Sequence, residues 1–214
     1  KDVLKHYERS NMKDGDMQHQ SHQKQIKEVV KLINTRLWSM LGHPSKPIVF
    51  KAGLTPRIYD PLSVIAYGYS SCTGLAILLI AALRSVGIAS RMAGTSAWYG
   101  DPDKGNHSWV EVYVPAAEEG GKGEWVFLEP SPGIAEGKSV EDANADDLDR
   151  NPCKRWFCNA DRFNGLTKVF ATRYTKSDAR MHYPMAWSDP GNDDGVPGEE
   201  RTDYYTGICG KCSH

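Results

Sequence analysis

The feature that most constrains the fold of this chain is an almost unbroken apolar run, Leu75–Leu83. Ser70 and Ser71, two residues of the type that caps helix N-termini, precede the run, and Gly87 follows it where a helix would end. A helix that is apolar on nearly every side must be buried. The sequence therefore predicts a central core helix that begins close to Cys72.

Cys72 falls in the first turn of this predicted helix. The partial positive charge at a helix N-terminus favours the thiolate, which is the nucleophilic form of cysteine. A free cysteine is more commonly a small buried hydrophobe. The position makes Cys72 a candidate nucleophile, with a packing residue as the alternative.

Charge and hydropathy exclude two classes of partner. The 214 residues carry 26 Lys and Arg against 27 Asp and Glu, so the chain lacks the excess of positive charge that is typical of nucleic-acid-binding proteins. Arg84 closes the longest apolar run well before the roughly 20 residues that a membrane span needs. We expect neither a nucleic-acid partner nor a membrane span, and the sequence indicates no oligomeric state.

An amphipathic helix is predicted over residues 25–41, ahead of the core helix, and it ends at the Gly-His-Pro sequence of residues 42–44. Its apolar residues recur at helical spacing: Ile26, Val29, Val30, Ile33 and Leu37. Residues 1–44 are therefore interpreted as an N-terminal helical segment that packs on the core. Residues 45–60, rich in proline, are predicted to form a loop with one short strand at Ile48–Phe50.

A strictly alternating stretch, residues 107–114, predicts a β-strand with two different faces. A turn rich in glycine and charge, residues 115–123, separates it from a second predicted strand, residues 124–129. Residues 88–93 are predicted to form a further strand. The alternation divides the side chains of the first strand into Val110, Val112 and Val114 on one face and His107, Trp109, Glu111 and Tyr113 on the other.

Folding the two strands into a hairpin centred on residue 118 sets His107 directly opposite Glu129. Directly opposed residues share a face, with Cβ atoms about 4.5–5.5 Å apart. The hairpin therefore predicts an imidazole beside a carboxylate. A surface pair without function is the alternative.

Cysteine, histidine and a carboxylate have a defined division of labour in acyl transfer. The imidazole takes the thiol proton, and the carboxylate holds the imidazole in the useful tautomer. The backbone N–H of a nucleophile at a helix N-terminus lies where an oxyanion could be held. The three residues predict a thioester intermediate on Cys72.

Three blocks of the chain resemble the core of the transglutaminase-like superfamily, which includes microbial thiol hydrolases and peptide N-glycanase. The resemblance extends over roughly residues 59–133 and implies Cys72 as nucleophile, His107 as base and Glu129 as orienting acid. The family usually has Asp at this third position, so Glu129 is a departure by one methylene group. The three blocks are Gly68–Gly74 with Leu83–Ile88, Gly105–Val112 and Trp125–Pro130.

The resemblance implies a papain-like α+β fold, with the nucleophile helix packed on an antiparallel sheet, in a catalytic core of residues 45–135. Its members include cross-linking transferases, peptidases, deglycosylases and inactive relatives. We expect a hydrolase or peptidase that acts on an amide bond of a peptide or protein. The alternatives are a protein-glutamine cross-linking transglutaminase and an inactive binding module.

A loop with two aromatic residues, Trp98 and Tyr99, precedes the histidine strand. Aromatic residues in loops beside a site commonly contact substrate, and their alternative is to cover the edge of the core. Together with Trp109, which shares the histidine face, they are predicted to bind substrate.

The C-terminal extension, residues 136–214, contains four cysteines: Cys153, Cys158, Cys209 and Cys212. Two disulfides in a secreted or periplasmic protein, a zinc site and a reduced set are all compatible with these positions. The first two cysteines lack the usual short spacing of a zinc knuckle, so disulfides are favoured and no cofactor is predicted. Trp156, Phe157 and Phe163 are predicted to be core residues, and residues 188–200, rich in Pro, Gly and Asp, are predicted to be mobile.

Overall fold

The protein is described here by a computed structural model. The first 19 residues, and much of the predicted C-terminal extension, lie outside the described ranges. These ranges are residues 20–43, 45–52, 59–116, 121–132, 153, 155–173, 182–183 and 196–212.

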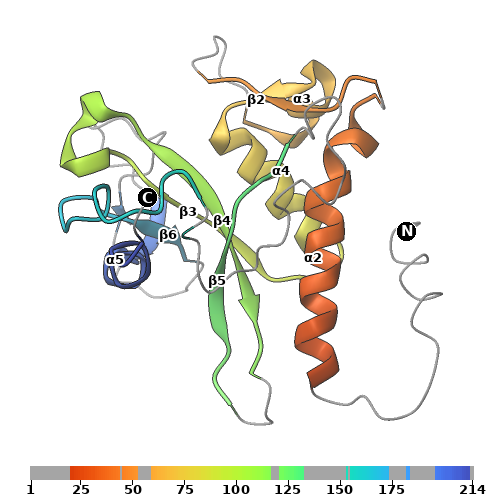
Figure 1. The fold of residues 1–214 in the computed structure, drawn as a ribbon. Helices are drawn as coiled ribbons and strands as arrows, with labels where there is room; N and C mark the ends of the chain where they lie inside the picture. The colour runs from red at the N-terminus through yellow and green to blue at the C-terminus, as the bar shows by residue number, and fades with distance from the viewer. Residues whose placement is uncertain are drawn as a thin grey trace.

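An antiparallel sheet forms the middle of the molecule, with helices on both sides (Figure 1). Its strand order is β5-β4-β3-β6-β8-β7, and every neighbouring pair is antiparallel. The predicted α+β fold with an antiparallel sheet is therefore confirmed. The strands are β3 (Ser90–Thr95), β4 (His107–Val114), β5 (Glu124–Leu128), β6 (Phe170–Thr172), β7 (His182–Tyr183) and β8 (Val196–Glu200).

The predicted core helix is α4 (Cys72–Ser85), with Ser71 as its N-cap residue in extended conformation. The helix ends just before Gly87, as the sequence predicted. Gly87 has φ +83°, the Ile88 N–H donates to the Leu83 carbonyl at 3.0 Å, and the Gly87 N–H donates to the Arg84 carbonyl at 3.0 Å. These are the two hydrogen bonds of a Schellman motif, which satisfies the last carbonyl groups of the helix.

Two further helices flank α4. The amphipathic helix α2 (Gln20–Leu41) begins five residues before its predicted start. Helix α3 (Pro61–Tyr67) was not predicted, although its capping signals are in the sequence. The Asp60 side chain accepts a hydrogen bond from the Ser63 N–H at 2.9 Å, Pro61 occupies the first turn, and Gly68 ends the helix at φ +72°.

Two short strands connect these helices to the site. β1 (Val49–Phe50) pairs in parallel with β2 (Tyr69–Ser70), which immediately precedes α4. The predicted strand at Ile48–Phe50 is thus present, one residue shorter. The pairing ties the segment after α2 to the start of α4.

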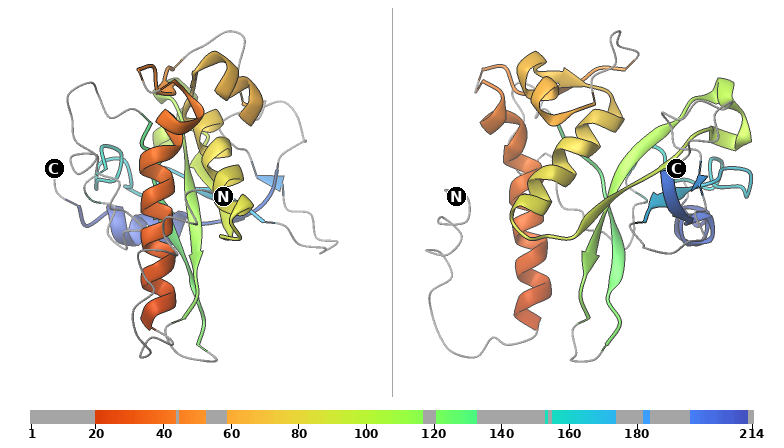
Figure 2. Two further views of the ribbon diagram at one scale, coloured as in Figure 1. Left: turned by 90° about the vertical axis from the view of Figure 1, so that its right-hand side faces the viewer. Right: turned by 180° about the vertical axis from the view of Figure 1, so that it is seen from behind.

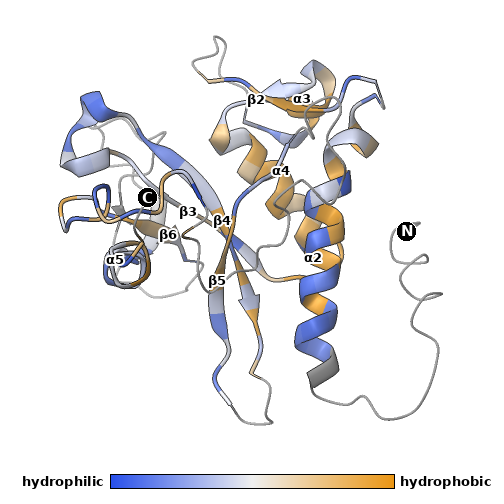
Figure 3. Ribbon diagram, viewed as in Figure 1, coloured by the Kyte–Doolittle hydropathy of each residue, from blue (hydrophilic) through white to orange (hydrophobic). Residues whose placement is uncertain are grey.

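The two faces of the sheet carry different cores. The aliphatic core lies between the sheet and helices α2 and α4, and only two of its buried side chains, Trp38 and Phe170, are aromatic. Figure 3 shows α2 with an apolar face toward α4 and a polar face away from it. The buried side chains of this core include Val30, Ile33, Leu37, Leu75, Leu79, Leu83, Val110, Val112, Val126 and Leu128.

The aromatic core covers the opposite face, beneath α5 (Thr202–Cys209) and the segment 155–173. From behind, α2 and α4 lie on one side of the β4–β5 hairpin and α5 on the other (Figure 2). Strand β4 is therefore covered on both faces, and among its residues only Tyr113 is exposed. The rings of this core belong to Trp98, Trp109, Phe127, Phe157, Phe163 and Tyr205.

The C-terminal part is joined to the rest through the sheet and through two disulfides. β6 pairs with β3, and β8 pairs with β6. Of residues 188–200, predicted to be mobile, residues 188–195 lie outside the described ranges, and residues 196–200 form a strand instead. Sheet pairing satisfies their backbone groups, which their composition alone does not reveal. The division of the chain into segments 1–44, 45–135 and 136–214 stays a prediction. None of the described helices has both the length and the apolar composition needed to cross a membrane.

Candidate active site

His107 and Glu129 are hydrogen-bonded partners. His107 is the first residue of β4, and Glu129 follows the last residue of β5. The His107 Nε2 and Glu129 Oε1 atoms are 2.9 Å apart. Both side chains are largely shielded from solvent, with exposed fractions of 8% and 14%. The imidazole is therefore held beside a carboxylate in a site of reduced solvent access.

The predicted register of the hairpin is wrong by two residues. Val110 pairs with Leu128 and Val112 with Val126, so continuing the ladder by one residue sets Glu129 opposite Trp109. Since side chains alternate with a period of two, a shift of two residues keeps His107 and Glu129 on the same face. They are diagonal neighbours, a separation that long side chains can bridge. The extra methylene group of Glu relative to Asp helps its carboxylate to reach the ring.

Cys72 is the first residue of α4, and it is the only cysteine of the chain outside the disulfides. The Thr73 Oγ1 atom lies 3.2 Å from the Ser108 Oγ atom, a buried contact that ties the start of α4 to β4. Cys72, His107 and Glu129 all line one pocket of about 350 Å³. The structure thus brings together the three residues that were predicted to be catalytic.

The charges of the site favour a thiolate–imidazolium pair. Burial raises the pKa of the Cys72 thiol, but hydrogen bonding and charge attraction to His107, with a hydrogen bond from the Ser108 backbone, outweigh it and lower the pKa below its usual value. Burial lowers the pKa of His107, yet the Glu129 charge and hydrogen bonds to Cys72 and Glu129 raise it to about 10. Each group thus stabilises the charged form of the other.

Of the residues predicted to bind substrate, two are buried behind His107. Trp98 is 3% exposed and Trp109 is fully buried, both in the aromatic core. The Tyr99 hydroxyl donates to the Asp161 carboxylate at 2.6 Å. None of the three lines the pocket of Cys72, and their binding of substrate stays a prediction.

Trp156 lines the pocket instead, with its ring centroid 5.1 Å from that of His107. It was predicted to be a core residue, and this is wrong, because 57% of it is exposed. Phe157, next along the chain, is fully buried as predicted.

Asn34 is a second residue of the site that sequence reasoning missed. It is not among the apolar residues predicted to pack on the core, but it is fully buried. Its side-chain NH₂ donates to the Glu129 carbonyl at 2.8 Å, and its side-chain oxygen accepts from the Ser131 N–H at 3.1 Å. Its spacing of four from Val30 and three from Leu37 places it on the apolar stripe, which was the available signal.

Glu111 shares the histidine face of β4 but has different partners. The carboxylate is fully buried and accepts hydrogen bonds from Arg91 Nε at 2.7 Å, Arg201 Nε at 2.9 Å and the Tyr205 hydroxyl at 3.0 Å. The Trp109 indole N–H donates to the same hydroxyl at 2.7 Å. This buried network joins β3, β4 and α5, and it makes Glu111 a structural group rather than the partner of His107.

The four C-terminal cysteines form two disulfides, Cys153–Cys212 and Cys158–Cys209. Of the alternatives that their positions left open, the favoured disulfides are the ones present. No group of three or more His, Cys, Asp or Glu side chains in the described ranges is arranged to hold a metal ion.

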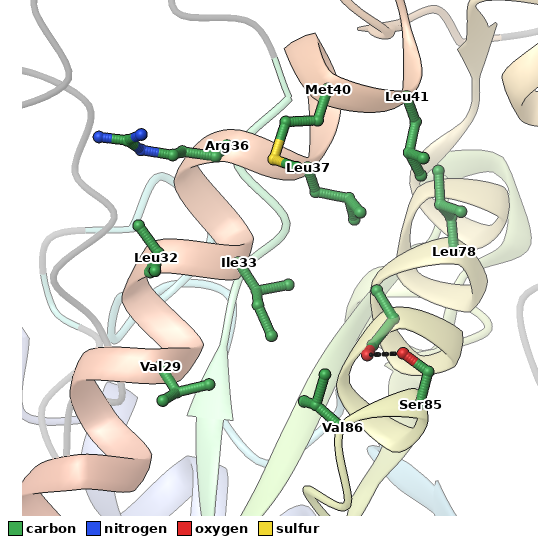
Figure 4. A pocket seen from close by; sticks show the side chains of 11 residues that line it. Val29, Leu32, Ile33, Arg36, Leu37, Met40, Leu41, Leu78, Ser85 and Val86 are labelled. Atoms are coloured by element: carbon green, nitrogen blue, oxygen red, sulfur yellow. Dashed lines mark hydrogen bonds between the residues drawn. The ribbon is translucent and has the colours of Figure 1, made fainter. Parts of the chain in front are cut away.

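A second hollow, of about 370 Å³, lies between α2 and α4, away from these residues (Figure 4). Its walls are mainly aliphatic, from Val29 to Leu41 on α2 and from Leu78 to Val86 at α4, and Arg36 is its one charged side chain. The Ser85 hydroxyl there donates to the Ala82 carbonyl within the helix. Among the described residues that line it, none carries a thiol, an imidazole or a carboxylate.

Comparison with known families gives one result. Residues 17–130, more than half of the chain, match the transglutaminase-like superfamily. Comparisons with curated proteins and with solved structures gave no match. The matched range includes α2 and the three residues predicted to be catalytic, Cys72, His107 and Glu129. The chain belongs to the transglutaminase-like superfamily.

Proposed function

We propose that the protein is a cysteine hydrolase that cleaves an amide bond of a peptide or protein through a thioester on Cys72. The observation that carries the proposal is the placement of a free thiol with a lowered pKa in the same pocket as a bonded His–Glu pair. A thiolate is the nucleophilic form of cysteine, and an adjacent imidazolium favours it. Intact groups in all three roles argue against an inactive binding module.

In the proposed reaction the Cys72 sulfur attacks the amide carbonyl carbon, and the carbonyl oxygen takes the negative charge. The first N–H groups of a helix lack intrahelical acceptors, so the backbone N–H of Cys72 is a candidate donor to this oxyanion. His107 gives its proton to the leaving amine as the C–N bond breaks, which leaves the thioester. Glu129 holds the ring in position and stabilises its charged form.

The second half of the reaction returns the enzyme to its first state. His107 takes a proton from water, the resulting hydroxide attacks the thioester carbon, and the C–S bond breaks to release a carboxylic acid. The thiolate and the imidazolium are then restored.

The two disulfides support the secreted or periplasmic location proposed from sequence, since disulfides persist in oxidising compartments.

The second candidate is a protein-glutamine cross-linking transglutaminase, in which a primary amine replaces water. Apolar side chains beside the thiol, among them Leu75, Pro130 and Trp156, favour it, because a transferase must hold water away from the thioester. Both candidates use the same thioester, so the presence of Cys72, His107 and Glu129 does not distinguish them.

One experiment tests both candidates. The protein is incubated with a library of amide-bearing peptides and a labelled primary amine, and free acid and labelled product are both quantified by mass spectrometry. Release of free acid that is absent in Cys72→Ala supports the hydrolase. Label incorporation that outpaces acid release supports the transferase, and the absence of both products with the wild-type protein contradicts an acyl-transfer enzyme.

A further inference from the structure

We propose that Trp156 and Phe50 form two walls of a subsite for a large apolar side chain of the substrate, on the acyl side of the cleaved amide. This inference rests on the proposed thioester chemistry. Both residues line the pocket of Cys72. Both are exposed aromatic residues, with 57% of Trp156 and 53% of Phe50 accessible to solvent. Exposed aromatic side chains beside a nucleophile favour binding of an apolar ligand group, because the contact removes apolar surface of both from water.

Trp156 is exposed but held in place. Cys153 and Cys158 on either side of it are fixed by the two disulfides. The Arg162 guanidinium lies 5.0 Å from the centre of the Trp156 ring and donates to its carbonyl at 3.4 Å. The ring also meets Trp98 edge-on, at 6.1 Å between centroids. A rigid aromatic surface binds a ligand group with little loss of conformational entropy.

The rest of the pocket defines the chemical class of the ligand. Among the described residues that line it, the only ionisable side chains are Cys72, His107 and Glu129, which the chemistry itself uses. The remaining walls combine the apolar residues Ala52, Leu75, Pro130 and Pro132 with the uncharged polar residues Ser71, Asn106 and Ser108. None of these seven offers a charge to an ionised substrate side chain, so the desolvation of such a side chain against them would not be offset by an ion pair. The subsite therefore fits an aromatic or large aliphatic residue.

Chloromethyl ketones of N-acetylated amino acids test this without a known substrate, because the Cys72 sulfur displaces chloride and forms a C–S bond. We expect the phenylalanyl reagent to alkylate Cys72 at least about tenfold faster than the aspartyl reagent, measured by intact mass. Trp156→Ala should remove most of this preference, Trp156→Phe should retain it, and Leu166→Ala, an exposed residue outside the pocket, should leave it unchanged.

Equal rates for the two reagents, or a preference that survives Trp156→Ala, would overturn the subsite. If Trp156→Ala does not fold, Phe50→Ala is used for the same comparison, since Phe50 lines the same pocket and is distant from the disulfides in sequence. Iodoacetamide has no side chain to recognise and serves as the reference. A wild-type thiol that is slow toward iodoacetamide at pH 6 contradicts the proposed function and not the subsite alone.

A different observation supports a second inference, which rests on the same chemistry. The geometry points to Asn34 as a positioning residue for Glu129. Glu129 lies one residue beyond the end of β5, so the ladder hydrogen bonds stop before it, and the next residue, Pro130, has no N–H. The Asn34 side chain holds the backbone on both sides, through the Glu129 carbonyl and the Ser131 N–H. It thereby fixes the residue whose carboxylate holds His107.

The pH dependence of Cys72 alkylation by iodoacetamide tests this role. A displaced Glu129 would weaken the thiolate–imidazolium pair, so less thiolate would form at low pH. We expect Asn34→Ala to lower the rate at pH 6 about tenfold and to leave the rate at pH 10 unchanged, because the thiol ionises there without help. Thr35→Val is the matched control, since Thr35 is buried in the same turn and its hydroxyl donates to the Lys31 carbonyl of the same helix.

A double-mutant cycle separates positioning from simple destabilisation. If Asn34 acts through Glu129, then Asn34→Ala should add little to the loss already caused by Glu129→Gln. Additive losses, or an unchanged ratio of rates at pH 6 and pH 10, would overturn the role. If Asn34→Ala does not fold, Asn34→Asp keeps the shape, removes the donor to the Glu129 carbonyl and is judged by the same ratio.

Discussion

The aliphatic and aromatic cores on the two faces of the sheet are built in different ways. The aliphatic core is dominated by helices α2 and α4, and its buried side chains on α4 are close together in the sequence. The aromatic core gathers rings from Trp98 to Tyr205, and it also contains two disulfides and the buried Glu111 network. Hydrophobic burial thus suffices for the helical face, whereas the loop-rich face is also cross-linked and hydrogen-bonded.

The candidate active site lies at the seam between these two cores. Cys72 comes from the helix that fills the aliphatic core, whereas the His107 ring contacts Phe157 at 5.0 Å, within reach of the aromatic core. The thiol and the imidazole therefore depend on different parts of the chain. Changes on one face should be separable from changes on the other, and the predictions below use this difference.

The largest expected effect is on activity. Glu129→Gln removes the charge that stabilises the His107 imidazolium, and we expect the rate of amide cleavage to fall by about 10²–10⁴-fold. The same charge raises the pKa of His107, so the free energy of unfolding should also fall at neutral pH, where His107 is charged in the folded state. Urea denaturation and product release, measured on the same sample, check both parts. Unaltered cleavage would remove Glu129 from the catalytic role.

The next effect is on stability and belongs to the aromatic face. Glu111→Gln removes the charge that the buried Arg91 and the partly buried Arg201 share, although Arg91 keeps its ion pair with Glu199. We expect a loss of about 3–5 kcal/mol in the free energy of unfolding. The exposed pair Lys168–Glu200 is the control, because Lys168→Gln should cost less than about 1 kcal/mol. A Glu111 variant of normal stability that has lost activity would reverse the roles assigned to the two glutamates.

Reduction of the disulfides should show whether the two cores unfold independently. The disulfides close loops of 59 and 51 residues, and loss of a native disulfide typically costs about 2–5 kcal/mol. We expect a thiol reductant to increase amide hydrogen exchange first in α5, at residues 202–209, and later in α4, at residues 72–85. Simultaneous loss of protection in both helices would mean that the cores unfold as one unit.

The smallest expected effect is the pH dependence of stability. His107 has a pKa raised from 6.5 to about 10 in the folded state, so its contribution is fully present below pH 6.5 and is lost as pH rises through about 10. Cys72 has a lowered pKa, so its contribution is present above its usual value of 9.0 and is lost as pH falls. With rising pH, the stability contribution of His107 therefore decreases while that of Cys72 increases. We expect a shallow slope between pH 6.5 and 9 in the wild type and a steeper decline in Cys72→Ala, measured by urea midpoints.

Glu129→Gln in the Cys72→Ala background is the control for this last prediction. Without the carboxylate, His107 loses the charge that raises its pKa, so the decline with pH should become weaker. A slope that is unchanged by the second substitution would assign the pH dependence to another group.

The sequence by itself determined the elements whose signals are local. The apolar run and Gly87 defined α4, the alternation at residues 107–114 defined β4, and three short blocks identified the superfamily. Each of these signals depends on side chains within a few residues of one another. Burial of a continuous stripe or face leaves a periodic pattern that any fold of the chain must respect.

Only the tertiary structure decided how distant segments meet. It fixed the hairpin register, chose one of the three pairings that four cysteines allow, and placed Asn34 against Glu129, 95 residues away in the sequence. It also set Trp156 beside His107. The spacing of Asn34 indicates that it is buried but does not reveal its partner, because each of these contacts depends on where two separately formed elements come to pack.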